Sequence, residues 1–213
     1  MHTIIIGFML IAFLAACGNS KTDEVSVPPI PSTDDKPPAP ADDRPIILAF
    51  GDSLTAGSGL PPGSGYPEIL QAELDSRGYR YHVVNAGIGG DTTSDGLVRV
   101  ERAVALHPEI VILELGGNDG LRGIPVESMQ SNLEKLILAG MTLPRNYGAE
   151  YISTFEKVYA ALATKHKVTL IPFFLEGAAG NPELNVDEIH PNEAGYKIVT
   201  ANVLRYLEPM LTK

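Results

Sequence analysis

From residue 45 onward, short apolar runs alternate with segments whose apolar residues recur at helical spacing. Apolar runs closed by glycine or by polar residues predict buried strands of a parallel sheet. Five such runs are Ile46–Phe50, Tyr81–Asn85, Ile110–Leu115, Ile137–Leu143 and Val168–Phe173. The intervening segments predict helices near Pro67–Gly78, Thr93–Leu106, Val126–Leu136, Glu150–Lys165 and Glu193–Leu207. This alternation predicts right-handed crossovers and a three-layer α/β/α fold with a five-stranded parallel sheet.

One junction does not fit this pattern. The helix expected over Val126–Leu136 runs directly into the apolar run that begins at Ile137, with no turn residues between them. A crossover helix needs a loop before the chain returns as a strand. Either the helix ends early, near Lys135, or the fourth strand is displaced.

The N-terminus has the pattern of an export signal. Residues 4–16 are apolar, a length too short to span a bilayer but suitable for a signal-peptide core. The segment ends in Leu14-Ala15-Ala16-Cys17, which resembles the cleavage site of bacterial lipoproteins, whose Cys is lipid-modified. We therefore expect residues 1–16 to be a lipoprotein signal peptide. The alternative is an ordinary signal peptide followed by an incidental Cys.

Residues 17–44 are rich in proline and aspartate and have little to bury, so they predict an extended, disordered tether. The remaining residues, 45–213, are of a length and hydrophobicity that suit one globular domain. The formal net charge of −10 excludes a nucleic-acid partner, which needs a basic surface, and disfavours electrostatic adhesion to anionic lipid. The single Cys excludes an internal disulfide.

The first strand leads directly into Gly51-Asp52-Ser53, which places Ser53 at the strand's C-terminal end, where open α/β sheets bind ligands. Taken alone, this tripeptide is also a common turn. Asp187 precedes His190 by three residues in a later loop. A serine nucleophile needs a base, and the base needs a carboxylate that fixes its tautomer. A capped surface loop and half of a metal site are the alternatives for this pair, but a metal site needs more ligands than the loop offers.

Two other strand-end loops can supply donors for a developing oxyanion. Gly90 can present a backbone N–H at close approach, and Asn118 can present its side-chain amide. Each residue alone is ordinary in a turn or a cap. Together with Ser53 and the Asp187–His190 pair, they place four chemical groups on four strand-end loops.

The four blocks Gly51-Asp52-Ser53-Leu54, Gly90, Gly116-Gly117-Asn118-Asp119 and Asp187-x-x-His190 resemble those of the SGNH (GDSL) hydrolase superfamily. Residues 114–123, 143–148 and 172–174 resemble its bacterial periplasmic branch of acyl-CoA thioesterases, lysophospholipases and arylesterases. The resemblance implies a flavodoxin-like sheet, no metal, no cofactor and a monomer. It implies Ser53 as nucleophile, His190 as base and Asp187 as its orienter. It implies an oxyanion hole formed by the Ser53 N–H, the Gly90 N–H and the Asn118 amide.

The chain departs from that branch between Leu133 and Ala139, where it is shorter by roughly a dozen residues, about the length of a helix end, a turn and a strand start. The shortening coincides with the missing turn. It lies outside the four blocks, so the predicted catalytic residues stand, while the fourth strand and the loop after it are in question.

The expected activity is hydrolysis of small acyl esters and thioesters by a lipid-anchored protein. Its location would be the cell envelope, facing the periplasm, and Gly18 after Cys17 favours the outer membrane. Five apolar or aromatic residues near the site are candidates for binding the acyl chain, namely Leu121, Ile124, Leu143, Pro144 and Tyr147. Two alternatives remain: a carbohydrate O-acetyl esterase and a non-catalytic envelope lipoprotein that uses the fold as a binding module.

Overall fold

The computed structural model describes residues 42–133, 141, 143 and 145–213. The expected signal peptide, Cys17 and most of the tether lie outside these residues. So do Pro144 and nearly all of the expected fourth strand, residues 137–143. The description below concerns the compact unit that begins at Asp42 and ends at Lys213.

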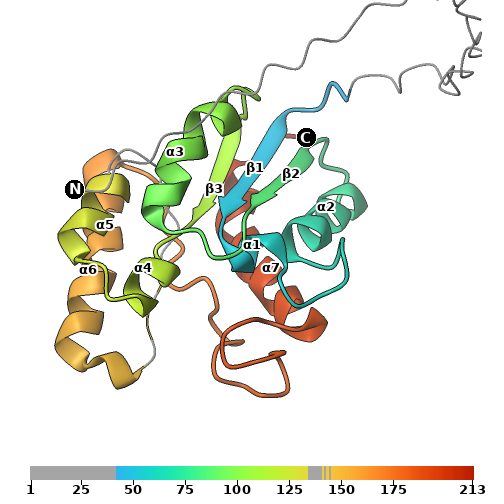
Figure 1. Cartoon of the computed structure of the whole chain (residues 1–213). Helices are drawn as coiled ribbons and strands as arrows, with labels where there is room; N and C mark the ends of the chain where they lie inside the picture. The colour runs from blue at the N-terminus through green and yellow to red at the C-terminus, as the bar shows by residue number, and fades with distance from the viewer. Residues whose placement is uncertain (1–41, 134–140, 142, 144) are drawn as a thin grey trace, which may run out of the picture. The chain divides into compact units, whose positions relative to one another are not determined.

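The sheet is built around strand β1 (Ile46–Gly51), which lies between β2 (His82–Gly87) and β3 (Ile110–Glu114) in the order β2-β1-β3. All three strands are parallel, and Leu48 of β1 is paired with Val84 on one side and Val111 on the other. Residues 47–51 are fully buried, because helices cover both faces of this central strand. The C-terminal ends of the three strands therefore lie together at one edge of the sheet (Figure 1).

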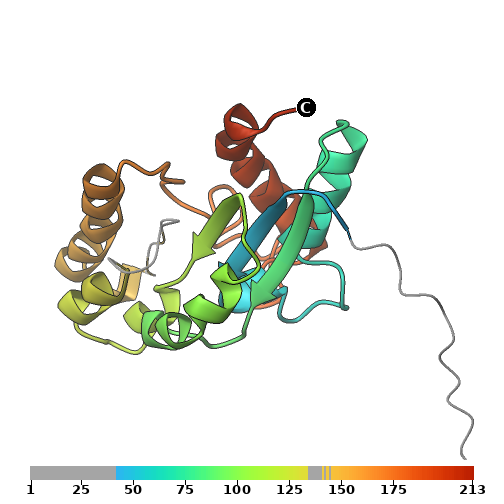
Figure 2. The same ribbon diagram turned by 90° about the horizontal axis from the view of Figure 1, so that it is seen from above.

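Helices follow the strands and pack on both faces of the sheet (Figure 2). Helix α2 (Tyr66–Ser76) packs against α7 (Glu193–Leu207), while α3 (Thr93–Val104) contacts α5 (Val126–Leu133), which contacts α6 (Ala149–His166). The short elements are α1 (Ser53–Ala56), α4 (Gly117–Leu121), and the 3₁₀ turns η1 (Arg145–Tyr147) and η2 (Glu208–Met210). The result is the predicted α/β architecture of three layers.

The number of strands differs from the prediction. The described part of the chain forms three strands rather than five, and residues 168–173, expected as the fifth, are not a strand. A parallel strand needs a neighbour that bonds to its backbone, and no described segment pairs with residues 168–173. Ile171 and the following Phe174 are nevertheless buried, so this segment keeps its apolar contacts without a strand's hydrogen bonds.

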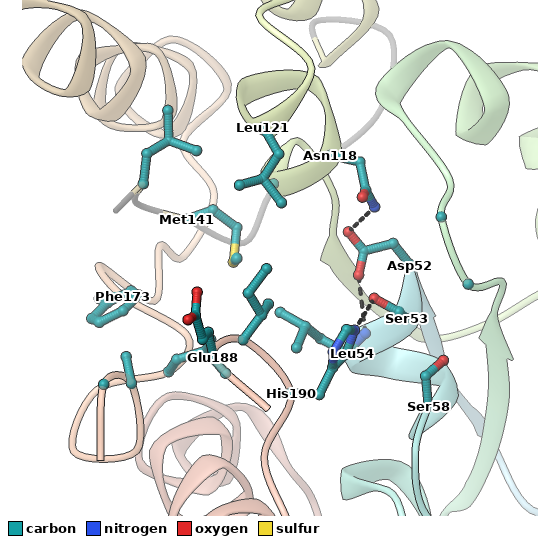
Figure 3. Close-up of a pocket in the computed structure, with 18 of the residues that line it drawn as sticks. Asp52, Ser53, Leu54, Ser58, Asn118, Leu121, Met141, Phe173, Glu188 and His190 are labelled. Atoms are coloured by element: carbon teal, nitrogen blue, oxygen red, sulfur yellow. Dashed lines mark hydrogen bonds between the residues drawn. The ribbon is translucent and has the colours of Figure 1, made fainter. Parts of the chain in front are cut away.

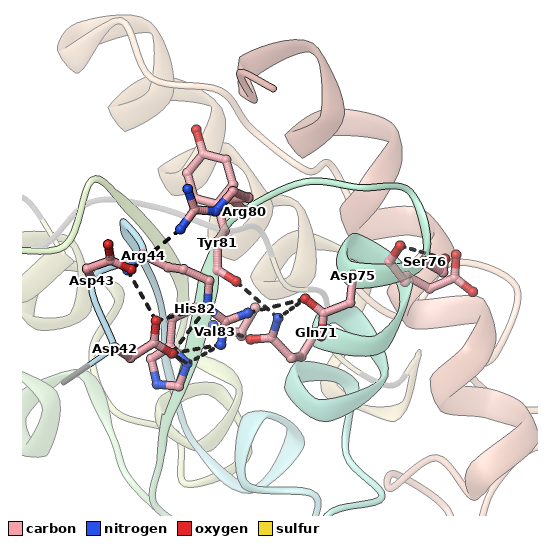
Figure 4. Close-up of polar contacts among 11 residues, drawn as sticks. Asp42, Asp43, Arg44, Gln71, Asp75, Ser76, Arg80, Tyr81, His82 and Val83 are labelled. Atoms are coloured by element: carbon pink, nitrogen blue, oxygen red, sulfur yellow. Dashed lines mark hydrogen bonds and ion pairs between the residues drawn. The ribbon is translucent and has the colours of Figure 1, made fainter. Parts of the chain in front are cut away.

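Polar contacts extend the domain three residues upstream of its expected start at Pro45 (Figure 4). Arg44 forms an ion pair with Asp42 at 2.7 Å and with Asp75 of α2 at 3.2 Å. The ring of His82 at the start of β2 lies 3.1 Å from the same Asp42 carboxylate. Hydrogen bonds from the Arg44 side chain hold the pKa of Asp42 well below its usual range. These residues, expected in the tether, join the domain.

No described helix in residues 42–213 has the length and apolar character needed to cross a bilayer.

Candidate active site

Ser53 lies at the point where β1 turns into α1. Glycine is required just before the turn, because a Cβ at Gly51 would overlap the Thr55 hydroxyl and the Glu114 carboxyl. Asp52 caps the helix by accepting a hydrogen bond of 3.0 Å from the Leu54 N–H. Ser53 is therefore the first residue of α1, where a backbone N–H has no partner within the helix. Its side chain faces the cavity at the strand ends (Figure 3).

The loop before α7 brings an acid and a base to Ser53. The Asp187 carboxylate accepts hydrogen bonds from the backbone N–H groups of Ile189 at 2.8 Å and His190 at 2.7 Å. Its other oxygen lies 2.8 Å from His190 Nδ1, and His190 Nε2 lies 2.9 Å from Ser53 Oγ. The loop is closed by a backbone bond of 2.8 Å from Val186 N–H to the His190 carbonyl. A continuous hydrogen-bonded chain thus runs from Asp187 to Ser53.

The charge of Asp187 fixes the direction of these hydrogen bonds. Partial burial acts to raise the pKa of Asp187, but the hydrogen bonds from His190 and Ile189 outweigh it and lower the pKa to about 2. The carboxylate is therefore ionised at neutral pH and accepts a hydrogen from His190 Nδ1. The Nε2 atom is left free to accept the Ser53 hydroxyl hydrogen.

Gly90 and Asn118 reach the same cavity from two other strand-end loops. Gly90 follows β2 with a φ of 85°, a conformation that favours glycine, and its carbonyl accepts a bond of 2.8 Å from Arg122. Asn118 lies in α4, and its amide nitrogen donates to the Asp52 carboxylate and to the Asp91 carbonyl, both at 2.9 Å. The structure thus brings together all five of the catalytic and oxyanion-hole residues expected from the sequence.

Arg99 of α3 ties the strand ends to the Gly90 loop. Its guanidinium forms an ion pair of 2.6 Å with Asp91 and donates to the carbonyls of Ala86 at 2.7 Å and Gly51 at 2.8 Å. The guanidinium carbon also lies 3.9 Å above the centre of the Phe50 ring. One side chain therefore fixes the ends of β1 and β2 and the residue that follows Gly90.

A buried carboxyl pair beneath Ser53 was not foreseen. Glu114 ends β3 with no exposed surface, and Asp52 is 2% exposed. Burial raises the pKa of Glu114 well above its usual range, and the neighbouring Asp52 charge raises it further. Burial also raises the pKa of Asp52. The sequence feature that could have predicted this pair is Glu114 itself, an acidic residue at the end of an otherwise apolar strand, where an unpaired buried charge is costly.

The site opens into a cavity of about 920 Å³. Its walls include the apolar residues Leu121, Met141, Leu143, Ile152, Phe173 and Leu175. Of these, Leu121, Met141 and Phe173 lie across the cavity from Ser53 and His190 (Figure 3). Leu121 and Leu143 thus line the cavity as the sequence predicts. The other four were not predicted, because nothing local in the sequence shows which apolar residues of their segments face the cavity rather than the core.

Two predicted lining residues do not reach this cavity, and Pro144 lies outside the described residues. The chain turns at Gly123 with a φ of 64°, and the Ile124 carbonyl beyond it accepts a 3.2 Å bond from Tyr151. Tyr147 donates to the Leu121 carbonyl at 3.0 Å and borders a separate hollow at the starts of α5 and α6. Neither Ile124 nor Tyr147 therefore lines this cavity.

No group of three or more His, Cys, Asp or Glu side chains in the described part of the chain is arranged to hold a metal ion.

The chain is similar in sequence and in structure to known proteins. Residues 49–198 match the GDSL-like lipase/acylhydrolase family, a span that includes both Ser53 and His190. Esterase TesA of Pseudomonas aeruginosa is 42% identical over 178 residues, which cover 78% of this chain and 89% of that protein. Thioesterase 1/protease 1/lysophospholipase L1 of Escherichia coli K12 is 34% identical over 178 residues, covering 78% and 84%. A crystal structure of TesA matches with a TM-score of 0.75 at 41% identity, covering 78% of this chain and 99% of the other.

Proposed function

The chain belongs to the GDSL-like lipase/acylhydrolase family, and from that premise we propose that it is a serine hydrolase that cleaves carboxylic esters and thioesters. The observation that carries this proposal is the hydrogen-bonded chain from Asp187 through His190 to Ser53, with its 2.8 and 2.9 Å links, at the mouth of an apolar cavity. The names of the relatives, an esterase and a thioesterase/lysophospholipase, support both substrate types.

The proposed reaction proceeds through an acyl-enzyme. Ser53 Oγ attacks the carbonyl carbon of the substrate while His190 Nε2 accepts the hydroxyl proton. The bond to the leaving oxygen or sulfur then breaks, and His190 returns that proton to the departing alcohol or thiol. Water, deprotonated by His190, then attacks the ester on Ser53. The carboxylic acid is released as His190 returns the proton to Ser53 Oγ. Asp187 stabilises the imidazolium that forms in each half of the reaction.

The tetrahedral intermediate needs donors for its oxyanion. The N–H groups of Ser53 and Gly90 and the amide of Asn118 are the proposed donors. Both hydrogens of the Asn118 amide are engaged in this structure, one with Asp52 and one with Asp91. One of them must therefore turn to, or be shared with, the oxyanion when the intermediate forms.

The cavity favours substrates with an acyl chain longer than acetate. Its apolar walls gain free energy from each buried methylene, about 0.8 kcal/mol per group. An acetyl group is too short to contact most of these apolar walls, so a carbohydrate O-acetyl esterase would not require them. A binding module would not require the hydrogen bond between Ser53 and His190. Neither alternative is favoured by an observation in the structure.

Hydrolysis of nitrophenyl esters from acetyl to dodecanoyl by the full chain, purified in detergent, tests this substrate class. We expect kcat/KM to rise from acetyl to medium chains, and Leu121→Trp, which fills the cavity, to shift the preference toward short chains. Ile124→Trp is the matched control, because Ile124 is nearby but does not line the cavity. A wild-type preference for acetyl would contradict the proposal and favour the sugar esterase.

We also propose that the enzyme is a monomer held in the cell envelope by a lipid on Cys17 and faces the periplasm. The support for the anchor is the Leu14–Cys17 pattern and the proline-rich segment after it, which can act as a spacer. The monomer is proposed on the family resemblance alone.

A further inference from the structure

Glu114 lies beneath the catalytic serine and has no role in the proposed reaction. Its Oε2 atom accepts hydrogen bonds from the Asp52 N–H at 3.3 Å and from the Thr55 hydroxyl at 3.0 Å. Its Oε1 atom is buried without a partner among the described residues. Gly51 makes room for this approach, since any side chain there would overlap the Glu114 carboxyl.

Asp52 links Glu114 to the oxyanion hole. One oxygen of the Asp52 carboxylate accepts from the Leu54 N–H at 3.0 Å, and the other accepts from Asn118 Nδ2 at 2.9 Å. The same Asn118 nitrogen donates to the Asp91 carbonyl, so two acceptors define the plane of the amide. Any change in charge or position at Asp52 is therefore transmitted to the amide that faces the substrate.

Two carboxyl groups buried side by side cannot both be ionised at ordinary cost. In the described part of the chain, neither Glu114 nor Asp52 has an ion pair with a lysine or arginine. The titratable groups that face the pair are Asp91, His190 and the tyrosines 66, 159 and 196. Asp52 accepts two N–H donors, whereas Glu114 has one unpartnered oxygen, so a proton is better placed on Glu114.

We propose that Glu114 is a positioning residue that acts through Asp52 on Asn118, as the neutral member of a carboxyl pair that holds one proton. This inference rests on the proposed function. With Glu114 neutral, Asp52 is the fixed acceptor that orients the Asn118 amide. With both groups ionised, a second buried negative charge near Asn118 would oppose the negative charge that develops on the oxyanion.

Kinetics of variants of the full chain on nitrophenyl octanoate test the link to Asn118. We expect Glu114→Leu to lower kcat by roughly 10- to 100-fold with little change in KM, since the lost interaction acts in the transition state. Glu114→Gln, which keeps a neutral polar group, recovers kcat to within about threefold. In an Asn118→Ala background, Glu114→Leu adds less than about a threefold loss, because the two residues act as one unit. Fully additive losses, or a loss in KM instead of kcat, would overturn the proposal.

A second variant covers the case in which Glu114→Leu does not fold. Thr55→Val removes one of the two donors to Glu114 Oε2 with little change in shape. It is expected to lower kcat by a smaller factor, and again to add no further loss in the Asn118→Ala background. An additive loss would contradict the link to Asn118.

The protonation state of Glu114 in the folded protein can be tested without substrate. Folding raises the pKa of Glu114, so the unfolded chain releases this proton at lower pH than the folded one, and stability falls as pH rises between the two values. As pH rises from about 5 toward the raised pKa of the folded state, the unfolding constant of the wild type should increase relative to that of Glu114→Gln by up to about tenfold per pH unit. A flat ratio would mean that Glu114 is ionised in the folded protein and would overturn the proposal. This readout stands even if Ser53 proves not to be catalytic.

Discussion

At the scale of single residues, the orientation of His190 depends on one partly exposed carboxylate. Asp187 is held by two backbone N–H groups, so it faces the imidazole even though its side chain is 54% exposed. Its lowered pKa, about 2, means that its contribution to stability is present above the unfolded value and is lost only as pH falls toward 2. Above that range its role is to select the histidine tautomer.

Asp187→Asn should therefore reduce kcat without unfolding the protein. An amide in place of the carboxylate favours the wrong tautomer and does not stabilise the imidazolium, a loss of roughly 10²- to 10⁴-fold in triads of this kind. The measurement is kcat and KM on nitrophenyl octanoate at neutral pH. Glu183→Gln, a similar change at an exposed carboxylate in the same loop, is the control and should keep the wild-type rate. A kcat for Asp187→Asn equal to that of this control would remove Asp187 from the mechanism.

Residues that belong to recognisable blocks were predictable from the sequence, and residues that depend on strand register were not. Ser53, Gly90, Asn118, Asp187 and His190 each follow a strand or precede a helix in a recognisable pattern. Glu114 meets Asp52 only because β3 pairs with β1 so that Glu114 lies opposite Gly51. Nothing local in the sequence specifies that register, so the carboxyl pair emerges only from the folded sheet.

At the scale of elements, hydrophobic periodicity predicted the long helices and the three described strands to within a few residues, whereas the short helices α1 and α4 lie where only strand-end loops were expected. Helix α7 has the predicted bounds, Glu193–Leu207, because its apolar positions recur regularly and Asn192 caps its start. The prediction of a strand at residues 168–173 was wrong. An apolar run indicates only that a segment is buried, whereas a strand also requires a neighbouring strand that hydrogen-bonds to its backbone. The shortening near Leu133 adjoins residues 134–140, which the structure does not describe. The fourth strand therefore stays a prediction.

Arg99 gives a test of how α3 supports the site. Arg99→Gln removes the partner of a largely buried Asp91 and loosens the ends of β1 and β2, so unfolding free energy should drop by about 3 kcal/mol. Because Asp91 follows Gly90, kcat should fall as well. Denaturant unfolding and ester hydrolysis at neutral pH measure both effects. Arg102→Gln, on the exposed side of the same helix, is the control, and equal stability of the two variants would contradict this role.

At the scale of the whole molecule, the proposed lipid at Cys17 would tie the hydrolase domain to a membrane. A chain with a net charge of −10 gains little from an anionic lipid surface, so the proposed membrane association depends on the proposed lipid at Cys17. Cys17→Ser should move the exported protein from the membrane fraction to the soluble fraction. Ser20→Ala, a small change three residues away, should leave the distribution unchanged. An unaltered distribution of Cys17→Ser would leave only an ordinary signal peptide.

The central claim is that Ser53 forms the acyl-enzyme, and its most direct test is kcat/KM of Ser53→Ala on nitrophenyl octanoate beside the wild type. We expect Ser53→Ala to lower kcat/KM by at least about 10³-fold. Ser128→Ala, at an exposed serine of α5, should retain the wild-type value. If folded Ser53→Ala hydrolysed the ester as fast as the wild type, the nucleophile would lie elsewhere and the proposed mechanism would be wrong.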